Sequence, residues 1–275
     1  VKTDGALAAT TGALTIDSNG QIRVGNVFAR QALALNARED LSVVGQLVGT
    51  TGAALNSGAN VGVSGALETN GQLSVIAARD ASFAESMLAA QDVNVRAGGA
   101  LSQIDQFVIG GRYDARAGSI AALGATRANA GINLESSAAV TFANLATEQQ
   151  LTISAQGDIA GSGDSAALAG VSIVSTAGGI VNQGSLASAA GLSLSAAHDV
   201  VVNGDITSAG NVNVNAGRTL ALGGTLSVGG HANLTAHSAL TLAGRSDIAG
   251  GASLAAQTGN LVVLGDITAD TITAE

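Results

Sequence analysis

Three arginines are the residues of this chain whose spacing most resembles a binding site. Arg96 and Arg116 lie 20 residues apart, and Arg112 lies just before the second of them. Guanidinium groups bind carboxylates and sulfates through paired N–H donors, so the three together could form a small patch for an anionic glycan. The alternative is a self-compensating charge ladder, which the pattern favours because acidic residues lie close to the arginines: Asp92, Asp114 and Glu135.

Two pairs of acidic residues are candidates for catalytic carboxylates, since glycoside hydrolysis needs two carboxyl groups at a set separation. Glu39 and Asp40 are adjacent in a turn, and Asp158 and Asp164 flank a Gly-Ser-Gly stretch. Ordinary turn polarity explains both pairs. A lyase would need basic groups near acidic ones, but Lys2 is the only lysine, and aromatic platforms for sugars are almost absent. We therefore predict no catalytic residues and no enzyme activity.

Metal and cofactor sites are not indicated by the remaining polar residues. His198, His231 and His237 are expected at exposed turns, and no cysteine or second histidine lies at metal-ligand spacing. The glycine-rich pieces lack the Lys-Ser/Thr that follows a phosphate-binding loop. The prediction is no metal and no cofactor.

The composition excludes several classes of function. The chain has 38 glycines, no proline, no cysteine and no tryptophan, and its apolar residues are mostly small aliphatics. The net charge is −9, with nine basic against ten acidic residues in 1–127 and two against ten in 128–275. Such a chain is a poor ligand for nucleic acid or anionic membranes. It also lacks the run of about 18 apolar residues that membrane insertion by a helix requires.

A repeat of about 20 residues runs through the whole chain. Each repeat begins an alternating strand with an apolar anchor residue, and successive anchors are 19 to 21 residues apart. The anchors are Leu14, Leu33, Ala53, Leu73, Val93, Tyr113, Ile132, Leu151, Val171, Leu192, Val212, Ala232, Ala252 and Ile272.

Three short strands separated by turns fill each repeat, because two further apolar positions follow the anchor. Glycine, Asn, Asp and Ser occupy the turns between them. The pattern predicts an all-β fold, a right-handed parallel β-helix of roughly 13 coils. The anchor Val212 would point inward while Asn211, Asn213 and Asn215 point outward, where stacked amides can hydrogen-bond along the axis.

Three coils depart from the pattern and are expected to contain bulges or loosened loops. Residues 113–131 place Ile120 early and Arg127 near the third strand, residues 151–170 show no clear third strand, and residues 232–251 shift the third apolar position to Ile248. Phe28 and Phe107 are both expected in the core, at the repeat position of Leu47 and Leu67.

The repeats GALTIDSNGQIRVGNVFAR and AGLSLSAAHDVVVNGDITS resemble those of the filamentous haemagglutinin family, very large exoproteins of Gram-negative two-partner secretion systems. The resemblance covers essentially the whole chain. It implies a β-helical shaft that passes unfolded through an outer-membrane transporter partner and is then displayed at the bacterial surface or released. The family's Asn-Pro secretion motifs are missing because there is no proline, and no Arg-Gly-Asp occurs.

The resemblance implies a structural shaft segment, residues 1–275, of a longer solenoid without caps. Its function would be attachment of a secreted surface adhesin to glycans or receptors of host cells, through the intact protein. The alternatives are a β-helical polysaccharide lyase or hydrolase, and the shaft of a contact-dependent inhibition toxin exoprotein. Open strand edges at both ends of the segment predict end-to-end self-association.

Overall fold

The computed structural model describes residues 1–3 and 5–275, which form 42 strands and no helix. The fold is a parallel β-solenoid of about 14 coils, each of about 20 residues. The sequence repeat thus predicted the fold class correctly. It predicted roughly 13 coils, one fewer than the structure has. The chain divides into two compact units, Val1–Ser136 and Ser137–Glu275, which are described separately.

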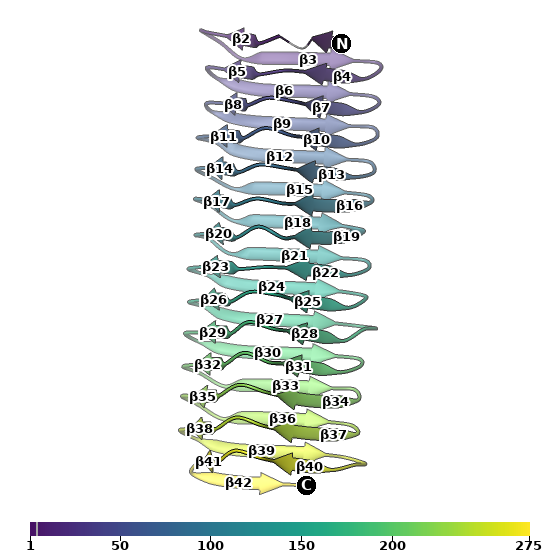
Figure 1. The fold of residues 1–275 in the computed structure, drawn as a ribbon. Coiled ribbons are helices and arrows are strands. Elements are labelled where there is room, and N and C mark those ends of the chain that lie inside the picture. The colour runs from purple at the N-terminus through teal and green to yellow at the C-terminus, as the bar shows by residue number, and fades with distance from the viewer. Residues whose placement is uncertain (4) are drawn as a thin grey trace. The chain divides into compact units, whose positions relative to one another are not determined.

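Unit 1 consists of three parallel sheets of seven strands, and every third strand along the chain joins the same sheet (Figure 1). The first sheet contains β1 (Lys2–Thr3), β4 (Ile22–Val24), β7 (Leu41–Val43), β10 (Val61–Val63), β13 (Ala81–Phe83), β16 (Ala100–Gln103) and β19 (Ser119–Ala122). The second contains β2 (Leu7–Ala9), β5 (Val27–Ala29), β8 (Leu47–Gly49), β11 (Leu67–Thr69), β14 (Met87–Ala89), β17 (Phe107–Ile109) and β20 (Thr126–Ala128). The third contains β3 (Leu14–Ser18), β6 (Ala32–Ala37), β9 (Gly52–Ser57), β12 (Gln72–Ala77), β15 (Val93–Ala97), β18 (Tyr113–Ala117) and β21 (Ile132–Ser136).

Unit 2 repeats the same order in three sheets of its own strands. Its first sheet contains β22 (Val140–Phe142), β25 (Ile159–Gly161), β28 (Ile180–Asn182), β31 (Val200–Val202), β34 (Thr219–Leu222), β37 (Ala239–Leu242) and β40 (Leu261–Val263). The second contains β23 (Leu145–Thr147), β26 (Ser165–Ala167), β29 (Leu186–Ser188), β32 (Ile206–Ser208), β35 (Leu226–Val228), β38 (Ser246–Ile248) and β41 (Ile267–Thr268). The third contains β24 (Gln150–Ala155), β27 (Gly170–Ser175), β30 (Gly191–Ala196), β33 (Val212–Ala216), β36 (Ala232–Ala236), β39 (Gly251–Ala256) and β42 (Thr271–Ala274).

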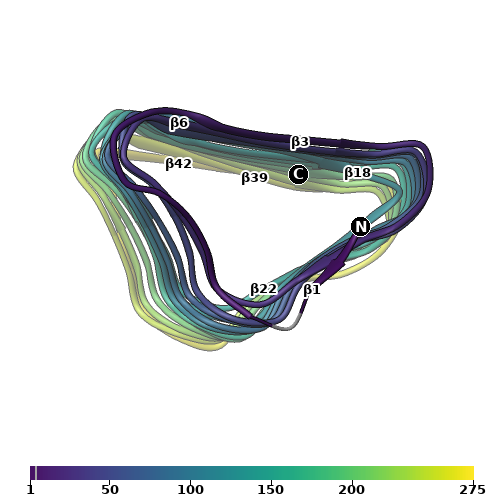
Figure 2. The ribbon, with the colours of Figure 1, turned by 90° about the horizontal axis from the view of Figure 1, so that it is seen from above.

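The coils wind in the right-handed sense that the sequence predicted. Seen from the N-terminal end, the chain of unit 1 runs clockwise as it recedes, with β3 and β6 along one side of the coil and β1 along another (Figure 2). This is the hand strongly preferred by connections between parallel strands of one sheet.

The core of each unit is built from the anchor residues and their inward neighbours. Leu33 pairs with Ala53, which pairs with Leu73, so the predicted anchors stack in register from coil to coil. Anchors of the inner coils are buried, whereas Leu14 in the first coil is half-buried and Ile272 in the last is 51% exposed. Each buried Val, Leu or Ile side chain stabilises the fold by roughly 1.5–3 kcal/mol relative to exposure.

The three coils that depart from the sequence pattern keep their register, so the prediction of bulges or loosened loops was wrong. Ile120 pairs directly with Leu101. In the coil of residues 151–170, β26 supplies the third strand, and Ser165 stacks on Leu145. In residues 232–251, Ser246 takes the place below Leu226. In the second and third of these coils a small buried serine, Ser165 or Ser246, fills the inward position, and a search for apolar residues does not detect it.

The prediction that Phe28 lies in the core was also wrong, because its side chain points outward. Val27, not Phe28, aligns with Leu47, and Phe28 aligns with the outward Val48. The Phe28 side chain is 38% exposed, whereas Phe107 is fully buried as expected. Alternation along a strand has a period of two, so an offset of one residue reverses the side to which a side chain points.

The outward amides form short ladders along the third sheet of each unit. Asn233 Nδ2 donates to Asn213 Oδ1 at 3.0 Å in unit 2. In unit 1, Asn56 donates to Asn36 at 2.7 Å, and Asn36 donates to Asp17 at the same distance. The predicted stacking of polar side chains is therefore present, although it links two or three coils at a time.

Candidate functional site

The candidate arginine patch, Arg96, Arg112 and Arg116, lies on the outer surface of the third sheet of unit 1. Arg96 in β15 aligns with Arg116 in β18, so the two stack on adjacent coils as predicted. The coil before them presents Ile76, which is 47% exposed, and the coil after them presents Glu135. The structure therefore brings two of the three arginines together in one outward column.

Arg116 forms the ion pairs of this patch. Its Nε lies 3.2 Å from Glu135 Oε2 and 3.6 Å from Asp114 Oδ1. The Arg116 side chain is 51% exposed, so solvent screens both interactions, and each contributes at most about 1 kcal/mol. This part of the patch matches the charge-ladder interpretation.

Arg112 is held differently, through its backbone. Asp92 lies over it, as predicted, but Asp92 Oδ1 accepts the backbone N–H of Arg112 at 2.8 Å rather than a guanidinium proton. Within the described part of the chain, the guanidinium groups of Arg96 and Arg112 form no ion pair. A shallow groove beside Arg96 is lined by side chains that include Gln72, Asn94 and Asp92.

The chemistry of this surface suits an anionic, hydroxyl-rich ligand only in part. Two guanidinium groups without ionic partners and two side-chain amides offer donors for sulfates, carboxylates and hydroxyls. The three arginines are nevertheless matched by three acidic residues, so the formal charge of the cluster is zero: Asp92, Asp114 and Glu135. Binding of an anionic ligand here would depend on the local arrangement of hydrogen-bond donors rather than on a net positive charge.

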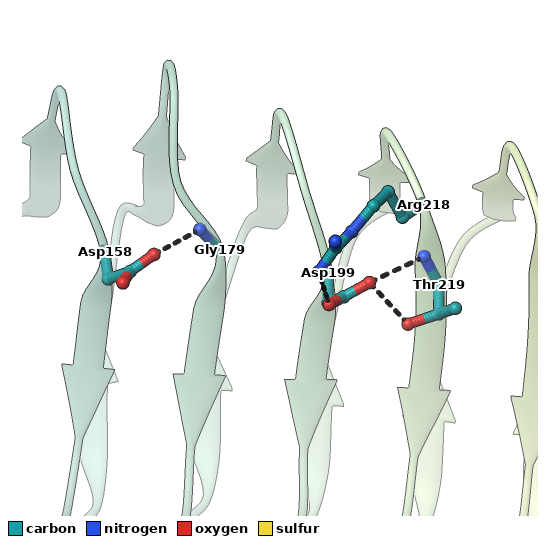
Figure 3. A network of polar contacts seen from close by, with 5 residues as sticks. All are labelled: Asp158, Gly179, Asp199, Arg218 and Thr219. Atoms are coloured by element: carbon teal, nitrogen blue, oxygen red, sulfur yellow. Dashed lines mark hydrogen bonds and ion pairs between the residues drawn. The ribbon is translucent and has the colours of Figure 1, made fainter.

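Three of the four candidate catalytic carboxylates, Asp40, Asp158 and Asp164, accept hydrogen bonds from the backbone of the next coil. Asp40 Oδ1 accepts from the Asn60 backbone N–H at 3.2 Å and from its Nδ2 at 2.9 Å. Asp158 Oδ1 accepts from the Gly179 N–H at 2.8 Å (Figure 3), and Asp164 Oδ1 accepts from the Ser185 N–H at 2.7 Å. These bonds give the side chains a structural role at the corners.

This arrangement recurs at all three corners, where an Asp or Asn immediately before a strand accepts the corner N–H of the following coil. A corner N–H group that no backbone carbonyl of the preceding coil accepts needs another acceptor. Sequence reasoning missed this role. Its signal was available in the positions that precede the strands: Asn26, Asp40, Asn60, Asp80, Asp92, Asn144, Asp158, Asp164, Asp199, Asp205 and Asn211.

The histidines lie at the surface of unit 2, and two of them make specific hydrogen bonds. His231 Nδ1 accepts the Gly251 N–H at 2.9 Å, which extends the corner ladder that begins at Asn211. His237 Nδ1 lies 3.0 Å from Gln257 Oε1. Among the described residues, no cluster of His, Asp and Glu could hold a metal ion.

Comparison with protein-family models, with curated proteins and with solved structures returned no match. The part of the chain that the structure describes also contains no helix able to cross a membrane.

Proposed function

We propose that this chain is part of the shaft of a large secreted bacterial surface adhesin, similar to filamentous haemagglutinin, that mediates attachment to host cells. The observation that carries the proposal is the unbroken coil register within each unit, with an inward column of apolar residues and turns of near-constant length. A stack of this kind extends with the number of its repeats, which is the property that a fibre needs.

The proposal includes a location and partners. The intact protein is secreted through an outer-membrane transporter and displayed at the bacterial surface, where glycans or receptors of host cells are its ligands. These statements rest on the resemblance of the repeats to exoproteins of two-partner secretion. The engagement of Asp40, Asp158 and Asp164 with backbone amides supports a structural role over a catalytic one.

Within the shaft, the arginine patch is our candidate for direct contact with an anionic glycan. Arg96 and Arg112 carry the proposal, because their guanidinium groups form no ion pair among the described residues. Arg116 would contribute by exchanging its exposed pairs with Asp114 and Glu135 for a sulfate or carboxylate of the ligand.

Binding of the chain to immobilised heparin and to epithelial cells, at low and physiological salt, tests this proposal. The variant Arg96→Ser, Arg112→Ser, Arg116→Ser should lose salt-sensitive binding. A matched control replaces three arginines elsewhere in unit 1: Arg30, Arg38 and Arg79. Both triple variants have a net charge of −12, from −9 minus three positive charges, so a difference between them reports position rather than charge.

Each outcome decides one part of the proposal. Loss of binding in the patch variant alone makes this surface an adhesive site. Equal loss in both variants reduces it to a general charge effect. No binding of the unaltered chain in either salt removes the glycan contact and leaves the segment as a spacer. Depolymerisation of an offered polysaccharide by the unaltered chain would overturn the shaft proposal in favour of an enzyme.

A further inference from the structure

The outward column of the second sheet in unit 1 is unusually apolar. The middle residues of its strands align in register from coil to coil. Leu88 is 50% exposed, and Val108 beside it is half-buried. From the second coil onward the column contains Phe28, Val48, Glu68, Leu88, Val108 and Arg127.

The corner next to this column adds further apolar side chains. Ile104 and Leu123, which directly follow β16 and β19, are 58% and 57% exposed. The apolar face therefore consists of Leu88, Val108, Ile104 and Leu123, with Glu68 and Arg127 at its two ends. The corresponding column of unit 2 is small or polar throughout: Ala146, Ala166, Ala187, Thr207, Ser227, Asp247 and Thr268. The coil repeat therefore does not require exposed apolar residues at this position, and their presence in unit 1 needs a separate explanation.

We propose that the apolar face binds a second copy of the chain, with the two solenoids antiparallel about a two-fold axis. The column reads Glu68, Leu88, Val108, Arg127, which is acidic, apolar, apolar, basic over four successive coils. A two-fold axis between the Leu88 and Val108 coils places Glu68 opposite the partner's Arg127 and Leu88 opposite the partner's Val108. Each dimer then contains two such ion pairs, and the same patch serves both copies.

Charge excludes the parallel arrangement of the same two faces. In that arrangement Glu68 would meet its own copy, and Arg127 would meet its own copy. Like charges directly opposite each other are unfavourable in packed interfaces. The antiparallel arrangement is therefore the one that the column specifies.

Side-chain size supports the same arrangement at the corner. The residues that directly follow β10, β13, β16 and β19 are Ser64, Ala84, Ile104 and Leu123. The two-fold axis places Ile104 opposite the partner's Ala84 and Leu123 opposite the partner's Ser64. Large side chains thus face small ones, as interdigitated packing requires.

The expected association is weak. Four coils span only about 14 Å, from three intervals of about 4.8 Å. Such a patch is smaller than the roughly 800 Å² per partner of a stable interface, so we expect dimers only at high concentration. Along a surface on which many copies are anchored, the effective concentration is high, and weak lateral pairing becomes significant.

Sedimentation velocity of the full chain over a range of concentrations is the first test. The mean mass should rise from 26.5 kDa toward that of a dimer. Glu68→Arg alone and Arg127→Glu alone each replace two attractive pairs with two repulsive ones and should weaken association by about tenfold or more. The double variant restores complementarity and should recover association to within about threefold of the original.

Two controls separate this interface from other effects. Thr207→Arg changes the charge at the matching position of unit 2 and should leave sedimentation unaltered. Far-UV circular dichroism of every variant checks that the solenoid is folded. End-to-end stacking would also raise the mass, but the two single reversals and the double variant would then not show the pattern of loss and recovery.

Orientation is tested by cross-linking, which is simple because the chain has no cysteine. Ala66 and Ala125 directly precede β11 and β20, three coils apart in one column. In the antiparallel dimer they face each other, so a mixture of Ala66→Cys and Ala125→Cys chains should form a mixed disulfide under mild oxidation. Disulfides within each variant alone would instead indicate a parallel pair. That result, a monomer at all concentrations, or a double variant that fails to recover would overturn the proposal.

Discussion

Asp199 and Thr219 lie one coil apart and are joined by two hydrogen bonds to a single oxygen. Asp199 Oδ1 accepts the backbone N–H of Thr219 at 3.0 Å and its hydroxyl at 2.7 Å, while Arg218 pairs with Oδ2 (Figure 3). The Thr219 hydroxyl, followed by Arg218, lowers the pKa of Asp199 from 3.8 to about 2. Bonds to the ionised form stabilise it, which is the physical cause of the lowered pKa.

This pair predicts a dependence of stability on pH. Because the pKa of Asp199 is lower in the folded than in the unfolded chain, its contribution is complete above about pH 4 and is lost as pH falls toward 2. The side chain is 31% exposed, so we expect a contribution below about 1 kcal/mol. Urea unfolding of the original chain and of Asp199→Ala at pH 7 and pH 2 measures it. The difference between the two chains should shrink at pH 2, and a constant difference would contradict this assignment.

Asp199→Asn separates the corner hydrogen bond from the ion pair. Asn26, Asn144 and Asn211 accept corner N–H groups elsewhere in the chain, so an amide oxygen is sufficient for this bond. Asp199→Asn should therefore be more stable than Asp199→Ala at pH 7 and should lack the acid-dependent loss of stability at this site. Equal stability of the two variants would show that the backbone bond contributes nothing.

A column of glycines lines one corner of unit 2 and should not tolerate side chains. A Cβ on Gly224 would lie 2.5 Å from the carbonyl oxygen of Gly204 in the preceding coil, and Gly244 stands in the same relation to Gly224 at 2.1 Å. Gly224→Ala forces adjacent coils apart, so we expect a loss of about 1–3 kcal/mol in the free energy of unfolding. Gly12→Ala is the control, since no atom of the described residues lies within 4 Å of its added Cβ, and it should change stability by less than about 0.5 kcal/mol.

The fold was predictable because one physical requirement repeats in every coil. Val93, Tyr113 and Ile132 each begin a strand, differ in size, and still align in register, since closing a coil of constant length brings each anchor over the last. The same spacing placed Arg96 over Arg116. Periodicity therefore predicts both the core and the outward columns of the third sheet.

Details that depend on single-residue offsets or on backbone donors were not predictable from that spacing. Phe28 was assigned inward because its strand begins one residue earlier than supposed. The contact between Asp92 and Arg112 was expected, but its donor is a backbone N–H, which the 20-residue spacing of charged side chains does not indicate. The inward position of Ser165 was also not predictable, because a pattern of apolar residues does not identify a buried serine.

Removal of the Tyr113 hydroxyl should stabilise the folded chain. Its ring is fully buried and contacts Phe107 edge-on, with 5.9 Å between ring centroids. Its hydroxyl has no hydrogen-bond partner among the described residues, and burial raises its pKa. Tyr113→Phe keeps the ring contact and removes the buried oxygen, so we expect stabilisation by about 1 kcal/mol in urea unfolding. A destabilised variant would mean that the hydroxyl is satisfied in solution.

Gln103 and Thr126 provide the opposite case, a buried hydrogen bond between two side chains. Gln103 Nε2 donates to Thr126 Oγ1 at 2.8 Å, and its second contact, with the carbonyl oxygen of Asp105, is longer at 3.3 Å. Thr126→Val keeps the shape of the side chain but removes the acceptor. A buried amide proton then loses its better partner, so we expect a loss of about 1–3 kcal/mol.

Replacing both partners tests whether this loss is the cost of an unpaired group. Gln103 aligns with Phe83 and Ala122, so its position in the column is one that apolar residues fill in the adjacent coils. Its Oε1 already has no partner among the described residues. The double variant Gln103→Leu, Thr126→Val removes the amide and the hydroxyl together and should unfold within about 1 kcal/mol of the original chain. If the double variant is instead less stable than Thr126→Val alone, the amide contributes through packing, and the hydrogen bond is not the main term.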